Sequence, residues 1–90
     1  MSSERFDEVR ELIAANDEAI VAAVNRRLAL VAELWQLKAK LGLDTLDPDR
    51  ERRLRERLAA ASSGPLSPPG LDRLVTELLS LTNAELGASA

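Results

Sequence analysis

The chain has 90 residues, contains neither cysteine nor histidine, and carries 12 basic against 15 acidic side chains, for a formal net charge of −3. These features exclude a disulfide framework, a thiolate metal site and imidazole catalysis, so we expect no metal and no cofactor. The negative charge, with Phe6 and Trp35 as the sole aromatic residues, argues against nucleic acid as a partner. No apolar run approaches the roughly 20 residues that cross a bilayer, and the polar N-terminus is not a signal peptide. We therefore expect a soluble, cytoplasmic protein without membrane contact.

The first predicted element is a long helix over about residues 6–41, which has no internal proline or glycine and ends at Gly42. Along it runs a seven-residue repeat, here called the apolar seam: Ile13, Asn16, Ile20, Ala23, Arg27, Leu30, Leu34, Leu37 and Leu41. Lys38 follows the charged Arg27 by eleven residues, so both cations share one helix face, about 16 Å apart along the axis. A guanidinium on a packing face requires an anionic partner, which makes Arg27 a candidate ligand-binding residue.

Two shorter helices are predicted next. One covers about residues 48–61, with Asp47 as its N-cap, proline at its first position and a mixed-charge face. A loop rich in serine, glycine and proline leads to the other, over about residues 68–86. Its apolar stripe comprises Leu71, Leu74, Val75, Leu78 and Leu79. The composition is strongly helical throughout, and residues 1–90 are predicted to form one all-α domain.

The length of the first helix bears on assembly. At 1.5 Å per residue it extends about 54 Å, whereas a compact monomer of this size has a radius of gyration of about 12 Å. Two short helices cannot cover so long a seam. We therefore expect an intertwined helical homodimer, in which two first helices pack together and pockets draw residues from both chains.

A cluster of charged residues forms the candidate site. A hairpin between the first two helices brings Lys38 close to Asp47, Arg50 and Glu51, with Arg27 on the same helix face as Lys38. Three cations and two carboxylates can bind a small polyanion and recognise a hydroxyl group. Because the cluster has no nucleophile and no imidazole, it is poorly suited to covalent or acid–base chemistry.

Each of these residues also has an ordinary structural interpretation. Arg27 could be a polar residue that fixes the register of a coiled coil, and Lys38 a lysine whose stem lies along the helix surface. Asp47 is most simply an N-cap. Glu51 could pair with Arg55 on a solvated face. The joint spacing of the set is what favours a site.

That spacing resembles the all-α chorismate mutases, which are dimeric helical proteins with an intertwined fold. The resemblance covers roughly residues 6–86 and rests on Arg10 with Asp17, on Arg27 with Lys38, and on Asp47-Pro48-Asp49-Arg50-Glu51. It implies an isomerase that rearranges chorismate to prephenate in the shikimate pathway of aromatic amino-acid biosynthesis. This reaction is unimolecular and needs no base, nucleophile or metal, so the missing histidine and cysteine are no obstacle.

The resemblance also implies roles for particular residues. Arg27, together with an Arg10 from the other subunit, would hold the two carboxylates of the dianionic substrate. Lys38 would bind the ether oxygen of the breaking C–O bond. Arg50 would add to the anion-binding set, while Glu51 and Asp47 would engage the region of the ring hydroxyl. Catalysis would therefore rest on Lys38, Arg27 and Glu51.

The third helix departs from the family pattern, which places a serine there and, four residues later, a glutamine or glutamate that also binds the ether oxygen. Thr82 takes the serine position, and Leu86, which cannot form a hydrogen bond, takes the second. Asn83 and Glu85 are the neighbouring polar candidates. Some small members of the family are activated by the first enzyme of the shikimate pathway, and such a partner is an open alternative for this chain.

Other functions remain open from the sequence. The same scaffold would serve an isochorismate-pyruvate lyase or an aminodeoxychorismate mutase. A non-catalytic helical dimerisation module would instead use its arginines to bind a partner's acidic surface. A nucleic-acid binder using Arg50 to Arg57 is disfavoured by the interleaved glutamates and the acidic net charge.

Overall fold

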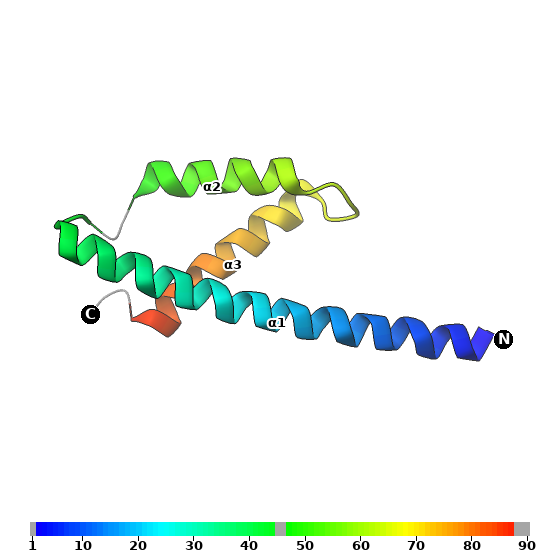
Figure 1. Ribbon diagram of the computed structural model, residues 1–90. Helices are drawn as coiled ribbons and strands as arrows, with labels where there is room; N and C mark the ends of the chain where they lie inside the picture. Colours follow the sequence, from blue (N-terminus) through cyan, green and yellow to red (C-terminus); the bar gives the residue numbers. More distant parts are fainter. Residues whose placement is uncertain (1, 45–46, 88–90) are drawn as a thin grey trace.

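The protein is built from three helices, as seen in a computed structural model that describes residues 2–44 and 47–87. Helix α1 spans Ser2–Leu41, α2 spans Pro48–Ala61 and α3 spans Pro68–Leu86 (Figure 1). The described residues contain no strand, and the predicted all-α class is confirmed. The bounds of α2 and α3 are those predicted, whereas α1 begins at Ser2 rather than near Phe6. Glu4 in the first turn stabilises this longer helix by its interaction with the helix dipole. The added residues before Phe6 carry no apolar side chain that would indicate a helix in the sequence.

The helix ends follow local capping chemistry. After α1, Gly42 adopts a left-handed φ of 69°, and the Leu43 N–H donates to the Lys38 carbonyl at 2.8 Å, which closes a Schellman motif. The Asp47 side chain accepts from the Arg50 N–H at 3.2 Å and caps α2, as predicted. Ser67 caps α3 in the same way, accepting from the Gly70 N–H at 3.1 Å. Residues 45–46 of the loop before α2 lie outside the described residues.

Helix α3 joins the other two helices. It packs against both α1 and α2, whereas the described Cα atoms of α1 and α2 stay more than 8 Å apart. In Figure 1, α3 runs obliquely from α2 to the C-terminal half of α1, and the N-terminal half of α1 projects beyond the other two helices. We call residues 2–23 of α1 the arm. No helix formed by the described residues is long and apolar enough to cross a membrane.

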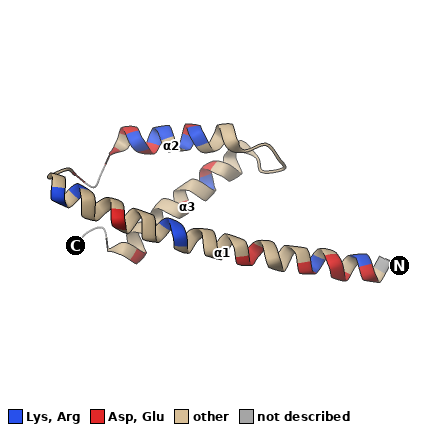
Figure 2. Ribbon diagram, viewed as in Figure 1, with Lys and Arg blue, Asp and Glu red and all other residues tan. Residues whose placement is uncertain are grey.

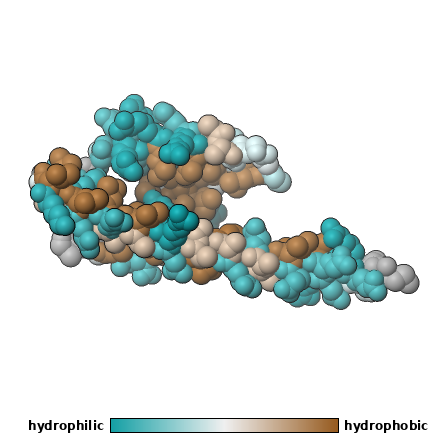
Figure 3. Space-filling model, in the orientation of Figure 1, coloured by the Kyte–Doolittle hydropathy of each residue, from teal (hydrophilic) through white to brown (hydrophobic). Residues whose placement is uncertain are grey.

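The core of a single chain is very small. Among the described residues, Val75 is the only fully buried apolar side chain, at 1 % exposure. Several residues of the C-terminal half of α1 are half-buried: Val24, Leu28, Val31 and Trp35. Most of the apolar seam and of the arm stays exposed, including Phe6, Ile13, Ile20, Leu30, Leu37 and Leu41. Figure 3 shows hydrophobic residues at the surface along α1.

The whole chain is correspondingly extended. It measures 61 × 23 × 17 Å, and its radius of gyration is 17.0 Å, against about 12 Å for a compact chain of 90 residues. Its accessible surface is 7520 Å², whereas a compact 9.8 kDa monomer would expose roughly 5,200 Å². A single chain therefore leaves an unusually large surface in contact with water.

Removing the cap of α3 tests this description of the helix. Ser67→Ala should lower the free energy of unfolding by about 1 kcal/mol, because the Gly70 N–H loses its acceptor. The measurement is urea denaturation at fixed protein concentration. Ser63→Ala is the matched control in the same loop, and it should change stability by less than about 0.5 kcal/mol. Equal midpoints for the two variants would show that the cap does not stabilise α3.

Candidate functional site

A cavity of about 770 Å³ lies between α1 and α2 and is closed at its base by α3. Its size falls within the range of small-molecule sites, roughly 300–1,000 Å³. The hollow is visible in Figure 3 between the two helices, with hydrophobic residues inside it. The lining residues comprise Arg27, Val31, Leu34, Trp35 and Lys38 of α1, Asp47 and then Arg50, Glu51, Arg53, Leu54 and Arg57 of α2, and Leu79, Thr82 and Asn83 of α3.

The wall formed by α1 carries two cations on an apolar face. Arg27 and Lys38 are both half-buried, three turns of helix apart, and both line the cavity. Leu34 and Trp35 lie between them on the same wall. Trp35 is half-buried and forms part of the wall. Apolar neighbours lower the local dielectric constant, so charge interactions inside the cavity are stronger than in water.

Thr82 on α3 provides an acceptor for Arg27. The Arg27 Nη1 donates to the Thr82 Oγ1 at 2.5 Å, and the Thr82 hydroxyl donates in turn to the Leu78 carbonyl at 2.7 Å. Thr82 is buried, at 5 % exposure. A guanidinium has five N–H donors in a fixed plane, so this bond to a buried partner anchors one corner of that plane at the base of the cavity and leaves the other donors available.

The wall formed by α2 carries both carboxylates and several arginines. Asp47 and Glu51 line the cavity, and each also makes the structural contact that was predicted for it from the sequence. Asp47 caps α2, and the Glu51 Oε1 forms an ion pair with the Arg55 Nη2 at 3.5 Å. The structural and functional interpretations of these two residues are therefore compatible.

Two arginines of the cavity were not anticipated. Arg53 and Arg57 line it beside Arg50, although the candidate site predicted from the sequence did not include them. The signal was present, because spacings of three and four residues put Arg50, Arg53 and Arg57 on one side of a helix. The cavity thus contains five cationic and two acidic side chains, an excess of three positive charges in a chain whose net charge is −3. Figure 2 shows this basic character along α2.

Three of the predicted site residues lie elsewhere in the chain. Arg10 is exposed on the arm, with its guanidinium 5.5 Å from the centroid of the Phe6 ring, and does not line the cavity. On α3, Thr82 and Asn83 line the cavity, whereas Glu85 and Leu86 do not. Within the described part of the chain, no group of acidic side chains is arranged to hold a metal ion.

A family model described as chorismate mutase type II matches residues 9–85, nearly the whole chain and every side chain of the cavity. Neither the curated proteins nor the solved structures give a match.

The bond between Arg27 and Thr82 can be tested by an isosteric change. Thr82→Val keeps the shape of the side chain but removes the acceptor for a half-buried charge, and should lower the free energy of unfolding by about 2 kcal/mol. Thr82→Ser keeps the hydroxyl and loses one buried methyl group, so its cost should stay below about 1 kcal/mol. Denaturant unfolding measures both. A valine variant as stable as the serine variant would mean that the bond contributes little.

Proposed function

We propose how this chain, which belongs to the chorismate mutase type II family, positions its substrate. The family activity is the isomerisation of chorismate to prephenate. The observation that carries the proposal is the cavity itself. It combines Arg27 and Lys38 on one face of α1 with Arg50 and Glu51 on α2, and it is positively charged in an acidic chain. Such a cavity suits a small dianion that also carries a hydroxyl group.

The reaction requires side chains that position the substrate and stabilise charge, and it requires no acid, base or nucleophile. A C–O bond of the ether breaks while a C–C bond forms between the enolpyruvyl arm and the ring, and no proton is transferred. The enzyme must hold the flexible arm over the ring and stabilise the negative charge that develops on the ether oxygen. In our proposal Lys38 donates a hydrogen bond to that oxygen. This interaction strengthens in the transition state, so it raises turnover more than it raises binding.

The remaining side chains hold the two ends of the substrate. Arg27, oriented by Thr82, binds one carboxylate through its remaining N–H groups, and Arg50 adds to the anion-binding set. Glu51 and Asp47 engage the region of the ring hydroxyl. Asn83 is the polar side chain of α3 that reaches the cavity besides Thr82. We propose it, in place of Leu86 and Glu85, as the second donor to the ether oxygen.

The second carboxylate is assigned to Arg10 of another copy of the chain, in a homodimer with two shared sites. The accessible surface supports such a dimer, because the excess over a compact monomer, roughly 2,300 Å² per chain, is of the size that obligate dimers bury. Charge supports it as well. Residues 4–18 hold six acidic and two basic side chains, while α2 holds five arginines and three acidic side chains (Figure 2). The arm of one copy is therefore complementary to α2 of the other.

Two finer points belong to the same proposal. Asn83 is a weak second donor on α3, which supports a low intrinsic activity. We therefore propose activation by the first enzyme of the shikimate pathway, and we place both proteins in the cytoplasm. The cavity would also admit isochorismate or an amino analogue of chorismate. A pyruvate-release assay with isochorismate separates the lyase from the mutase, and release at a rate matching chorismate consumption would favour the lyase.

Replacing Lys38 tests the catalytic role. Lys38→Ala should reduce kcat by about 10²–10³-fold with a smaller change in KM, because the lost bond is made mainly in the transition state. The assay follows the loss of chorismate absorbance. Lys40→Ala is the matched control, since Lys40 is exposed on the same helix and does not line the cavity. A Lys38→Ala variant with wild-type kcat would remove Lys38 from the mechanism.

Shared sites can be tested by mixing inactive variants. Arg10→Ala and Arg27→Ala should each be nearly inactive. When the two are refolded together, half of the random pairs are mixed and each has one intact site of two, so activity should return to about a quarter of wild type. Arg27→Ala mixed with Lys38→Ala is the control and should stay inactive, because both changes fall in residues supplied by the same chain. No recovery in the first mixture would contradict a site completed by Arg10 of a second copy.

A further inference from the structure

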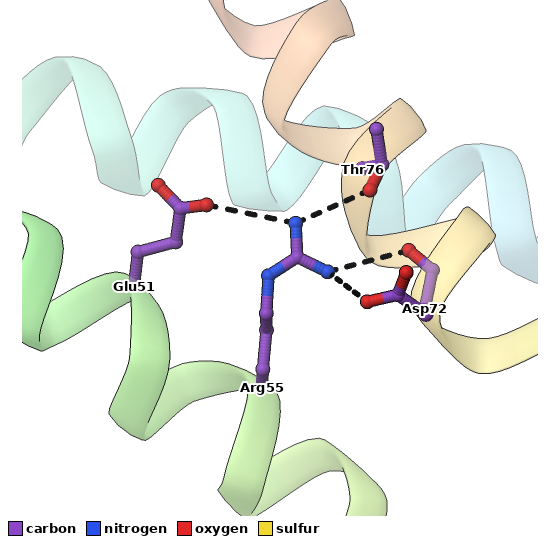
Figure 4. A network of polar contacts seen from close by, with 4 residues as sticks. All are labelled: Glu51, Arg55, Asp72 and Thr76. Carbon is purple, nitrogen blue, oxygen red and sulfur yellow. Dashed lines mark hydrogen bonds and ion pairs between the residues drawn. The ribbon is translucent and has the colours of Figure 1, made fainter. Parts of the chain in front are cut away.

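A network of polar contacts centred on Arg55 joins α2 to α3, beside the cavity (Figure 4). The Arg55 Nη1 donates to the Asp72 carboxylate at 2.6 Å and lies 3.4 Å from the Asp72 carbonyl oxygen. The Nη2 donates to the Thr76 Oγ1 at 3.2 Å and lies 3.5 Å from the Glu51 Oε1. The two edges of one guanidinium thus contact two residues of α3 and one residue of α2.

This arrangement differs from an ordinary surface ion pair. Arg52 and Asp49 form such a pair on α2 at 3.3 Å, with both side chains about 70 % exposed or more and no contact to another helix. The Arg55 side chain is 30 % exposed and reaches across to α3. A planar guanidinium held by several acceptors is fixed in direction as well as in place. Arg55 therefore fixes the Glu51 carboxylate relative to α3, the helix that also carries Thr82.

The position of Glu51 matters because the cavity accepts an anion. Glu51 lines the cavity, whereas Arg55, with which it forms an ion pair, does not. A carboxylate whose charge is not offset would repel a dianionic substrate, and it could turn instead toward the cations of the cavity. The Arg55 guanidinium, which lies outside the cavity lining, offsets that charge and engages one carboxylate oxygen of Glu51.

We propose that Arg55 is a positioning residue for the site, acting through Glu51. The inference rests on the proposed function, in which Glu51 engages the hydroxyl region of the substrate. That region is not altered as the ether bond breaks, so contacts there contribute alike to substrate and transition state. Loss of Arg55 should therefore appear in KM rather than in kcat. A purely structural role would lower stability and the active fraction without raising KM.

The test is steady-state kinetics of Arg55→Gln, which keeps the length of the side chain and removes its charge. KM for chorismate should rise about fivefold, the size expected for one partly exposed ion pair, with kcat changed less than about twofold. Arg52→Gln is the matched control and should leave both constants unchanged. Asp72→Asn weakens the contact of the guanidinium with α3 and should raise KM by about twofold. This variant replaces Arg55→Gln in the test if Arg55→Gln fails to fold.

A double mutant assigns the effect to Glu51. In a Glu51→Gln background, adding Arg55→Gln should raise KM no further, because the residue through which it acts has been removed. Equal rises in both backgrounds, or a lower unfolding midpoint with wild-type KM, would overturn the inference. Glu51→Gln with wild-type kinetics would instead contradict the proposed role of Glu51. If Glu51→Gln impairs the kinetics while Arg55→Gln has wild-type KM and kcat, the inference about Arg55 is overturned and the proposed role of Glu51 stands.

Discussion

A guanidinium keeps its proton at every physiological pH, so it can lie among apolar helix faces only where acceptors meet it. Arg27 is held in this position, half-buried on α1, by the hydroxyl of Thr82, which completes its own bonding at the Leu78 carbonyl. Thr82 can meet this requirement because α3 packs against α1. Helix α2 packs against α3 and does not approach α1. A space therefore remains between α1 and α2, and this space is the cavity.

The distribution of charge follows from the same geometry. The chain is acidic overall, yet the residues that face the cavity carry an excess of three positive charges, while acidic residues gather on the arm. Because the positive charges are concentrated at the cavity, an anion is attracted there although the chain as a whole is acidic. It also explains how 90 residues without histidine or cysteine can support an enzyme of this family. The rearrangement draws on orientation and charge, which arginine and lysine supply without proton transfer.

Much of the fold could be predicted because its signals are local. Asp47-Pro48 and Ser67-Pro68 mark helix starts by capping and by the fixed φ of proline, and both are correct. The eleven-residue spacing likewise placed Arg27 and Lys38 on one wall of the cavity. The start of α1 was missed because no apolar side chain marks it. Arg53 and Arg57 were missed for a different reason. Their spacing puts them on the same side of α2 as Arg50, but charges also lie on the other sides, so the position of α1 is needed to tell which side faces the cavity.

The weakest part of the cavity is its base, and hydrogen-bond chemistry says why. The Thr82 hydroxyl has a single proton, which it donates to the Leu78 carbonyl, while its oxygen accepts from Arg27. It therefore has no hydrogen left for an ether oxygen. Asn83 has an amide that can donate, but a neutral donor stabilises a developing negative charge less than a charged one does. In the proposed mechanism, transition-state stabilisation therefore falls mainly on Lys38. Any partner that moves α3 so that Asn83 comes closer to the substrate would raise turnover more than affinity.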